Sequence, residues 1–404
     1  MGTKINKKIA AMAALAIIAG GQGTRLFPIS NENCPKQFCP LNAETTFIQD
    51  SIIRFVKAGM DPKRIIIVVT NQNQYDLALK QTAGLGVIEP NILLISPKHD
   101  YAGAMIKADE YIERVFGDTI VVHTPADQFV NRGPNFTDAV IAMLESADST
   151  PTILGVEKHD INTMMGCGHA KYEPGKGNIR KVTGFIEKPD RLKAEELMRE
   201  GGSRANTGIC AWRTSHVPKK FRGYDEPLKT DVLMDEFLNS ESLNLVLGKF
   251  DWFDCGTLDS FWQISAKTPN HQNASFEAAD GGSIHRGNDS RRSLFFTIPG
   301  VELFGSHVKD AAVVINRIGD KIAICVVARS ASQLVRSLAE DFEKNKDILE
   351  RHFTLDGVNN RVSRTDCSDE IYCGFVGVSD YSVTVIKLPN SHYVVSVSKD
   401  SVAA

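Results

Sequence analysis

The sequence lacks the features that mark membrane, fibrous and nucleic-acid-binding proteins. Beyond one short apolar run at residues 9–19, no stretch approaches the roughly 20 apolar residues of a membrane span. The 46 Lys and Arg nearly balance the 49 Asp and Glu, a net charge of −3, which argues against a general binder of nucleic acid or membrane surfaces. Only 31 Gly and 16 Pro occur in 404 residues, which excludes collagen-like and low-complexity chains. What remains is an ordinary globular composition, 42% hydrophobic and 24% charged, long enough for two or three structural units.

Cysteine pairs with metal-binding or disulfide spacing are also missing. The eight cysteines form no C-x-x-C motif, so zinc fingers and disulfide-rich scaffolds are excluded. Scattered thiols are typical of a reducing compartment, and we expect a cytoplasmic protein. Lys4, Lys7 and Lys8 before the run 9–19 also resemble a secretory signal. We favour a buried first strand, because cleavage near Ala19 would destroy the glycine loop described below.

Short apolar runs alternate with helical patterns over the first two thirds of the chain. Strands are predicted at residues 15–18, 64–69, 91–95, 119–122 and 152–156, and helices at 46–57, 72–81, 102–115 and 135–144. Further strands are expected at 182–187, 205–212 and 243–250. This alternation predicts an α/β fold, a Rossmann-like, mostly parallel (mixed) sheet with helices on both faces. Ligands of such sheets bind at the carboxyl ends of the strands, so the loops after strands should carry the chemistry.

The last third of the chain is different and predicts a smaller β-rich C-terminal domain. Residues 268–282 are polar and turn-rich and are interpreted as a linker, so the predicted domains are 1–268 and 269–404. One helical pattern interrupts the β-rich part at 332–346. Segments 308–315 and 378–385 look alike and are each followed by a second β run. A repeat of paired strands and a chance similarity both remain open. This region has no cluster of catalytic residue types, so we expect it to support self-association, most simply as a homodimer.

A glycine-rich loop follows the first predicted strand. Closely spaced glycines at 20, 21 and 23 let backbone N–H groups approach phosphate oxygens. No Gly-Lys-Ser/Thr follows, and Leu26 stands where a dinucleotide-binding loop needs its third glycine. Arg25 adds a permanent cation suited to a polyphosphate. The alternative is a plain glycine turn with a surface arginine.

The stretch 20–38, GGQGTRLFPISNENCPKQF, closely resembles the signature of sugar-1-phosphate nucleotidylyltransferases. Its Pro-Lys-Gln-Phe at 35–38 resembles the mannose-1-phosphate guanylyltransferase branch. The resemblance implies that Gly20, Gly21, Gly23 and Thr24 bind the nucleotide. It also implies that Arg25 and Lys36 are catalytic cations on the triphosphate, although Lys36 by itself would be read as a solvated surface lysine.

Two carboxylates stand where this resemblance places a metal. Asp127 ends the segment Pro-Ala-Asp after a predicted strand, and Asp254 lies in Trp-Phe-Asp-Cys-Gly-Thr. Both segments resemble those that hold Mg²⁺ in the family, so Mg²⁺ is the implied cofactor. Mg²⁺ bound by one or two carboxylates and substrate phosphates is the usual arrangement for phosphate chemistry. Each aspartate has an alternative as a helix N-cap, Asp254 for a helix over 258–266.

Three further segments resemble the sugar side of the family's site. Phe-Ile-Glu-Lys-Pro at 185–189 implies that Glu187 binds sugar hydroxyls and that Lys188, a third catalytic cation, holds the sugar phosphate. Pro189 favours an extended Lys188, and a surface ion pair between Glu187 and Lys188 is the alternative. Asn206 and Gly168 complete the implied sugar-binding set. His169 is expected to be a pocket or surface histidine rather than a catalytic base.

The chain departs from the family at two places. Gly-Cys-Gly-His at 166–169 replaces the family's Gly-Tyr-Gly-Tyr, which implies a reshaped sugar pocket. Residues 96–104, SPKHDYAGA, replace the segment that approaches the base and ribose. From the resemblance as a whole we expect an enzyme that acts on a nucleoside triphosphate, GTP, and a sugar 1-phosphate, mannose 1-phosphate. We expect no nucleic-acid or membrane partner. Another base or a glucose or heptose phosphate remains open, as does a non-catalytic sensor of nucleotide sugars.

Overall fold

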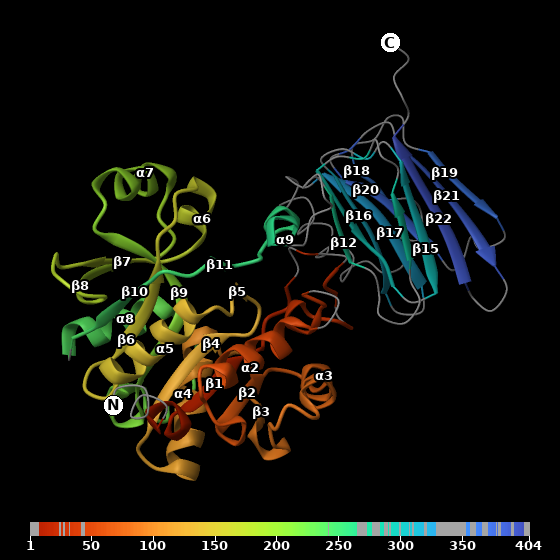
Figure 1. Cartoon of the computed structure of the whole chain (residues 1–404). Coiled ribbons are helices and arrows are strands. Elements are labelled where there is room, and N and C mark those ends of the chain that lie inside the picture. Colours follow the sequence, from red (N-terminus) through yellow and green to blue (C-terminus); the bar gives the residue numbers. More distant parts are fainter. Residues whose placement is uncertain are drawn as a thin grey trace. The chain divides into compact units, whose positions relative to one another are not determined.

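A nine-stranded mixed sheet lies at the centre of the first part of the chain in a computed structural model (Figure 1). Its strand order is β3-β2-β1-β4-β9-β6-β10-β8-β7. Strands β3, β2, β1 and β4 run parallel to one another, whereas β9 is antiparallel to both β4 and β6. The strands are β1 (Ala14–Ile18), β2 (Ile65–Val69), β3 (Ile92–Leu94), β4 (Ile120–Pro125), β6 (Thr152–Val156), β7 (His169–Tyr172), β8 (Ile179–Ile186), β9 (Ser203–Arg213) and β10 (Asn244–Gly248). The Rossmann-like mixed sheet expected from the sequence is confirmed.

The structure describes most of the first 264 residues and the strands of the C-terminal part. The described residues are 8–23, 26, 29–31, 33–41, 45–240, 242–264, 273–276, 283–286, 290, 292–298, 300–306, 308, 311–318, 321–328, 353–355, 361–365, 371–376, 378, 381–388 and 392–399. The chain divides into two compact units. The α/β unit comprises Met1–Gly20 and Ile48–Asp254, and the β unit comprises Gly21–Phe47 and Cys255–Ala404. The domain boundary expected near residue 268 stays a prediction.

Helices cover both faces of the sheet, which explains why strands such as β2 (IIIVV) are apolar throughout and fully buried. On one face α4 and α8 share a core with β9 and β10, formed by side chains such as Met105, Phe237 and Leu245. Helix α5 contacts β6, β9 and β10 and contributes no residue to that core, so it lies on the other face. The helices are α2 (Phe47–Lys57), α3 (Gln72–Thr82), α4 (Tyr101–Phe116), α5 (Pro134–Ala147), α6 (Ile161–Gly166), α7 (Arg191–Glu200), α8 (Thr230–Ser240) and, in the β unit, α9 (Leu258–Ile264).

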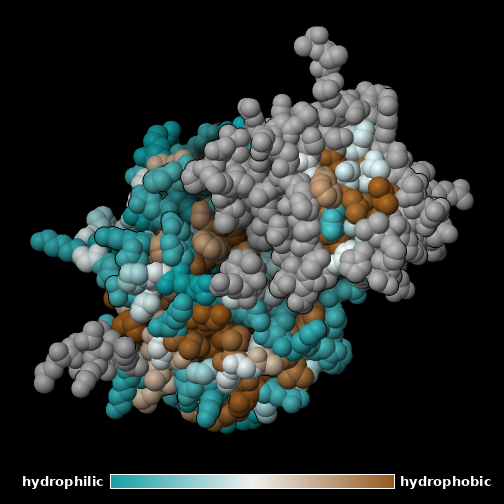
Figure 2. All heavy atoms as spheres, turned by 45° about the vertical axis from the view of Figure 1, so that its right-hand side comes forward, coloured by the Kyte–Doolittle hydropathy of each residue, from teal (hydrophilic) through white to brown (hydrophobic). Residues whose placement is uncertain are grey.

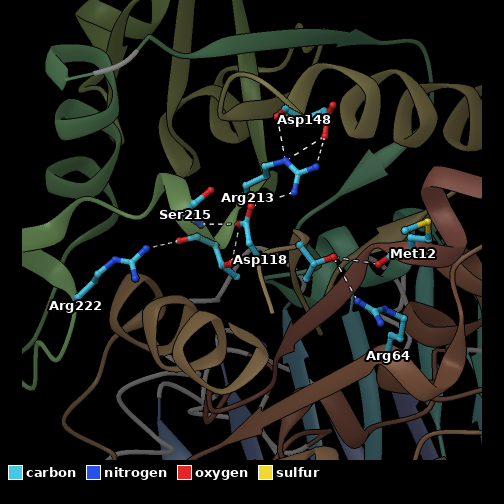
Figure 3. Close-up of polar contacts among 9 residues, drawn as sticks. Met12, Arg64, Asp118, Asp148, Arg213, Ser215 and Arg222 are labelled. Carbon is cyan, nitrogen blue, oxygen red and sulfur yellow. Dashed lines mark hydrogen bonds and ion pairs between the residues drawn. The ribbon is translucent and has the colours of Figure 1, made fainter. Parts of the chain in front are cut away.

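A polar network holds the amino end of β4 (Figure 3). Asp118 accepts hydrogen bonds from the Ser215 backbone N–H at 3.0 Å and the Thr214 hydroxyl at 3.1 Å. Arg213 bridges Asp118 and Asp148. Burial alone would raise the pKa of Asp118, but the hydrogen bonds from Ser215 and Thr214 and the charge of Arg213 lower it below its usual value. The network therefore ties the start of β4 to the end of β9.

The β unit contains two sheets that pack face to face as a sandwich. The six-stranded sheet has the order β12-β14-β16-β17-β20-β18 and the five-stranded sheet β13-β15-β22-β21-β19. Residues from both sheets, among them Phe295, Ile324, Val385 and Val395, form a single buried core. The strands are β12 (Asn273–Phe276), β13 (Ser283–Arg286), β14 (Ser293–Phe296), β15 (Val301–Ser306), β16 (Ala311–Ile318), β17 (Lys321–Ala328), β18 (Phe353–Leu355), β19 (Arg361–Thr365), β20 (Ile371–Val376), β21 (Tyr381–Leu388) and β22 (His392–Lys399).

The two look-alike segments occupy equivalent places in these sheets. The hairpin β16–β17 in one sheet matches the hairpin β21–β22 in the other, offset by 381 − 311 = 70 residues. Strands β15 and β20 are offset by the same 371 − 301 = 70 residues. Each pairs with the hairpin of the other half, β15 with β22 and β20 with β17. The topology supports a structural repeat, and this exchange means that neither half completes its sheet alone.

The C-terminal part differs from expectation at the predicted linker. The predicted linker 268–282 contains a strand, because Asn273–Phe276 forms β12 and pairs in parallel with β14. Its polar composition fits an edge strand, for which one face and one edge need no apolar cover. The helix predicted at 332–346 lies outside the described residues.

The visible surface mixes hydrophobic and hydrophilic residues (Figure 2). Among the described residues, the large apolar side chains with the highest exposure are Leu192 at 79%, Met12 at 61% and Leu94 at 49%. They lie on α7, before β1 and on β3. Single exposed apolar side chains are ordinary in proteins, so they assign no interface, and the homodimer stays a prediction.

Candidate active site

The glycine loop begins at the carboxyl end of β1, where Gly20 is held by the end of β2. The Gly20 carbonyl accepts hydrogen bonds from the Thr70 hydroxyl at 3.1 Å and from Gln74 Nε2 at 3.2 Å. A Cβ on Gly20 would lie 2.5 Å from Thr70 Cγ2, a distance that no side chain could accept. Thr70 and Gln74 were not predicted from the sequence, because a threonine and a glutamine at a strand–helix junction carry no motif.

Asp127 lies beside the same strand end. The Ala126 N–H donates to the Ile18 carbonyl of β1 at 3.1 Å. Helix α2 then holds both neighbours of Asp127: the Ser51 hydroxyl donates to the Ala126 carbonyl at 3.2 Å, and Arg54 Nη1 donates to the Gln128 carbonyl at 3.0 Å. The main chain on either side of Asp127 is therefore held by buried side chains, which presets where its carboxylate can point.

Arg54 is itself anchored inside the protein. It is fully buried and pairs with Asp50 at 3.3 Å, and Asp50 also contacts Arg132 at 3.2 Å. Burial raises the pKa of Asp50, opposed by the two arginines. A buried arginine needs such partners, and the sequence did not single out any residue of this group.

Asp254 approaches the same region through a two-stranded ladder. Strand β11 (Trp252–Phe253) pairs antiparallel with β5 (Phe129–Val130), with Phe253 opposite Phe129. Asp254 directly follows β11, and Asp127 and Gln128 directly precede β5. In an antiparallel pair, the residue after one strand and those before the other leave at the same end. The two predicted metal-binding aspartates are thus brought to one end of this ladder.

Lys158 braces the strand that carries Asp254. Its Nζ donates to the Trp252 carbonyl and lies 4.3 Å from the centre of the Phe253 ring. A cation over an aromatic ring adds attraction to the hydrogen bond. Lys158 follows β6 at the carboxyl edge of the sheet, so position alone, without a motif, was the signal that could have found it.

The alternative role of Asp254 as a helix cap does not hold. Helix α9 begins at Leu258, and its start is capped by Thr257, whose hydroxyl accepts from the Ser260 N–H at 3.1 Å. The Ser260 hydroxyl accepts from the Thr257 N–H in return, at 2.9 Å. Asp254 lies outside this reciprocal cap. The next residue, Cys255, has a φ of 52°, a strained conformation of the kind that is concentrated at functional sites.

The predicted sugar-binding residues lie at or beside three neighbouring strands. Gly168 directly precedes β7, Glu187 directly follows β8, and Asn206 lies in β9. A Cβ on Gly168 would lie 2.5 Å from Phe185 Cζ and 2.7 Å from Glu187 Oε2, so the backbone at Gly168 lies directly against these two side chains. The Asn206 N–H donates to the Gly168 carbonyl at 2.8 Å. Asn206 also lies at a bulge in β9, where the register with β6 shifts. A bulge re-aims side chains, and the Asn206 carboxamide oxygen accepts from the Gly208 N–H at 3.1 Å.

Lys188 differs from expectation in its backbone. The following proline predicts an extended residue, yet Lys188 has a φ of 40°, because the chain turns sharply between β8 and α7. Its Nζ lies 3.3 Å from Glu187 Oε1, and its side chain is 66% exposed. The ion pair named as the alternative is thus present, and left-handed backbone at a non-glycine residue carries strain.

The thiol of Cys167 lies close enough to both Asp254 and Glu187 for their charges to affect its pKa. Burial raises its pKa to about 12, and the charges of Asp254 and Glu187 are the next largest causes. Burial also raises the pKa of the Tyr101 hydroxyl well above its usual value, and the charges of Cys210 and Asp127 add to the increase. The Tyr101 hydroxyl donates to the Gly208 carbonyl at 3.0 Å, two residues beyond Asn206. Glu187 on the sugar side and Asp254 of the predicted metal site therefore lie near the same thiol, that of Cys167.

His169 is neither a pocket nor a surface residue. It is fully buried, and its Nε2 donates to the Met164 carbonyl at 2.7 Å. Burial lowers its pKa, and the hydrogen bond to the Met164 carbonyl and the charge of Glu187 oppose that shift. A period-2 strand position facing the core explains this result, and the glycine-rich motif around it concealed that position.

The β unit contains the remaining loop residues. Gly23 has a φ of 71°, and a Cβ there would lie 2.4 Å from Lys36 Cβ, so the loop packs directly on Lys36. Gln37 Nε2 donates to the Gly21 carbonyl at 3.0 Å. Lys36 is only 3% exposed, so the interpretation as a solvated lysine is wrong. Thr24 and Arg25 lie outside the described residues.

The donor set suits a hard divalent cation that keeps other ligands. No group of three or more His, Cys, Asp or Glu that could hold a metal occurs in the described part of the chain. Two carboxylates at one ladder end are hard oxygen donors, which fit Mg²⁺ completed by water and phosphate oxygens. As for membranes, none of the helices that the structure describes is long and apolar enough to span one.

Known proteins resemble half of the chain or more. The Xanthan biosynthesis protein XanB of Xanthomonas campestris is 30% identical over 210 residues, 52% of this chain and 44% of that protein. The chain thus spans less than half the length of this relative. The mannose-1-phosphate guanylyltransferase of Klebsiella pneumoniae is 25% identical over 345 residues, 74% of this chain and 70% of that protein.

Among solved structures, one described as mannose-1-phosphate geranyltransferase from Thermus thermophilus has the same fold. The TM-score is 0.67 at 22% identity, covering 82% of this chain and 99% of that one. A family model described as nucleotidyl transferase matches residues 15–271, which include four of the five residues of β1, both aspartates and the sugar-side segments. The chain therefore belongs to the nucleotidyl transferase family.

Proposed function

We propose that this chain transfers a nucleotidyl group from GTP to mannose 1-phosphate, giving a nucleotide sugar and pyrophosphate. The observation that carries the proposal is that Asp127 and Asp254 are brought to one end of the β5–β11 ladder. The charges of Glu187 and Asp254 both raise the pKa of Cys167, which supports a position of the sugar-side residues near this end. Family membership supports the reaction class. The names of relatives such as the Klebsiella pneumoniae guanylyltransferase favour the guanylyl and mannosyl choice.

In this mechanism an oxygen of the sugar phosphate attacks the α-phosphorus as pyrophosphate departs. A phosphate monoester is already anionic near neutral pH, so no strong general base is needed. Positioning and charge stabilisation then supply most of the rate. Mg²⁺ held by Asp127 and Asp254 would neutralise charge on the reacting phosphates.

The chain's own residues bind and orient the two substrates. Lys188 holds the sugar phosphate, and its neighbour Glu187 accepts hydrogen bonds from sugar hydroxyls. Asn206 and Gly168 define the other side of the sugar. Lys36 and Arg25 stabilise the triphosphate, while Gly20, Gly21, Gly23 and Thr24 approach the nucleotide with their backbone.

Release of pyrophosphate, measured over a grid of GTP, ATP, UTP and dTTP against mannose, glucose and heptose 1-phosphates, tests the proposal. We expect the fastest turnover with GTP and mannose 1-phosphate, and loss of turnover in Asp254→Ala with the fold retained. Faster turnover with another pair would correct the substrates while keeping the reaction. Binding of a nucleotide sugar without pyrophosphate release from any pair would instead identify a sensor.

Location and assembly are predictions of the same proposal. The scattered cysteines favour the cytoplasm, and the β unit is the part expected to self-associate as a homodimer. Light scattering coupled to size-exclusion chromatography measures the mass directly, and a monomer of 44.4 kDa would contradict the second prediction.

A further inference from the structure

Two cysteines of the β unit lie close together on either side of Lys36. The Sγ atoms of Cys34 and Cys39 are 3.5 Å apart. Cys34 is half-buried, whereas Cys39 is fully buried. Cys39 Sγ also lies 3.3 Å from the carbonyl oxygens of Ile29 and Cys34. The two sulfurs are therefore in near contact, one on a half-buried cysteine and the other on a fully buried cysteine.

The backbone around this pair is held in place at both ends. Asn31 and Cys34 exchange two backbone hydrogen bonds of 3.1 Å, and the Phe47 N–H donates to the Cys39 carbonyl at 3.2 Å. The Ile29 carbonyl, which faces Cys39 Sγ, also accepts from Asn316 Nδ2 of β16 at 2.9 Å. Because the scaffold is fixed, the two sulfurs are presented to each other by the native fold rather than by chance mobility.

The residues between the two cysteines contact the glycine loop. Lys36–Phe38 forms a short 3-10 turn. Gly23 packs against Lys36 with no space for a Cβ, and Gln37 donates to the Gly21 carbonyl. Any change in the Cys34–Cys39 separation must therefore be transmitted through Lys36 and Gln37 to the loop.

The two thiols are also unlike in acidity. The hydrogen bond with Cys39 lowers the pKa of Cys34, outweighing the opposite effect of burial. The same hydrogen bond and complete burial raise the pKa of Cys39. A thiolate is the reactive form of cysteine, so Cys34 is suited to react first and Cys39 second. Cys167, equally half-buried, has its pKa raised to about 12 and is a natural comparison within the same chain.

We propose that Cys34 and Cys39 are a redox modification site that forms a reversible intramolecular disulfide on exposure to a peroxide and thereby weakens binding of the nucleoside triphosphate. The Cys34 thiolate attacks one peroxide oxygen, the O–O bond breaks, and a sulfenic acid and one water form after proton uptake. The Cys39 sulfur then attacks the Cys34 sulfur. The S–S bond forms, the S–O bond breaks, and the hydroxyl leaves with the Cys39 proton as a second water. Overall two thiols and one hydrogen peroxide give one disulfide and two waters, and a dithiol reverses the change.

Closure has a structural consequence for the loop. A disulfide requires a sulfur–sulfur distance of about 2.05 Å, so the two sulfurs must approach by roughly 1.5 Å. The turn between them tightens, and Lys36 moves relative to Gly23, where contact is already close. The effect on nucleotide binding rests on the proposed function, whereas formation of the disulfide does not. A transient regulatory disulfide is also the type found in reducing compartments.

Peptide mapping of the full-length protein tests the modification directly. Trypsin cleaves after Lys36, so Cys34 and Cys39 fall in separate peptides, 26–36 and 37–54, that only a disulfide can join. After treatment with hydrogen peroxide and alkylation of remaining thiols, we expect the joined peptides, their loss on adding dithiothreitol, and Cys167 still alkylated. Recovery of Cys34 as sulfinic or sulfonic acid without joined peptides would overturn the proposal. So would a covalent dimer on a non-reducing gel that accounts for the joined peptides.

Kinetics of the oxidised protein test the functional half. We expect the KM for GTP to rise at least 5-fold on oxidation and to recover with dithiothreitol, while Cys34→Ala treated in the same way does not change. Cys39→Ala repeats the test from the buried side, and either variant suffices if the other does not fold. An unchanged KM in protein that carries the disulfide would refute regulation. Protein that forms the disulfide but shows no turnover before oxidation would instead refute the proposed function.

Discussion

The two ends of strand β4 each carry an aspartate, and the protein treats them in opposite ways. At the amino end, three protein donors contact the carboxylate of Asp118, supplied by Thr214, Ser215 and Arg213 (Figure 3). At the carboxyl end, α2 instead holds the main chain on both sides of Asp127, through the Ala126 and Gln128 carbonyls. At the amino end the hydrogen bonds hold the Asp118 side chain itself. At the carboxyl end they hold the backbone around Asp127, which sets the direction of its side chain toward the expected ligand.

The two ends of β4 differ in what their carboxylates should contribute: Asp118 to stability and Asp127 to activity. Hydrogen bonds that favour the charged form lower a pKa and add stability at neutral pH, as at Asp118. A carboxylate that binds a metal contributes only when metal and substrate are present. Identical substitutions at the two ends should therefore separate the two effects.

The largest expected effect is that of Asp127→Asn. The substitution removes one charge and keeps the shape, so we expect turnover to fall on the order of 10³-fold, since a metal ion supplies several kcal/mol of charge stabilisation. The melting temperature should change little, because the clamps from Ser51 and Arg54 act on neighbouring carbonyls. Steady-state pyrophosphate release and thermal unfolding measure the two quantities. Near-normal turnover at saturating Mg²⁺ would remove Asp127 from the metal site, and Asp118→Asn is the matched control.

A smaller effect is expected for Lys158→Met, which keeps the apolar stem and removes the ammonium group. Strand β11 then loses the hydrogen bond to the Trp252 carbonyl and the contact with the Phe253 ring. We expect kcat/KM to fall about 10-fold, equivalent to about 1.4 kcal/mol, and the Mg²⁺ concentration for half-maximal rate to rise. A role in stability alone would lower the melting temperature and leave the Mg²⁺ dependence unchanged. Lys80→Met, on the exposed side of α3, is the control for loss of a lysine charge.

The sequence predicted eight of the nine strands of the large sheet, all except β7, and the segments that meet at its edge, but not their geometry. Strands such as β2 were readable because burial on both faces demands an unbroken apolar run. The meeting of Asp127 and Asp254 depends on β5 and β11, two residues each, which are too short to leave a periodic signal. Their roles as metal ligands stay predictions.

Other features escaped because long-range packing overrides local preference. Pro189 predicts an extended Lys188, but the turn into α7 imposes a positive φ. Thr257 rather than Asp254 caps α9, because Thr257 directly precedes the first helical residue, Leu258. The clamp by Ser51 and Arg54 joins residues more than 70 positions apart, which no local pattern encodes.

The smallest effect is expected for Asp118→Asn, and it should concern stability alone. Asparagine can still accept from Ser215 and Thr214 but loses the charge that faces Arg213, so we expect a loss of about 0.5–1 kcal/mol of unfolding free energy at pH 7. Because the pKa of Asp118 is lower in the folded protein, its contribution is fully present above the unfolded value of about 3.9. It disappears as the pH falls through the folded value. Urea unfolding of both proteins at pH 7, 5 and 4 should therefore give a constant difference that begins to shrink only at the lowest pH, with kcat/KM unchanged at pH 7. A difference that grows on acidification would mean that the charged form is not the stabilising one, and the contrast between the two ends of β4 would fail.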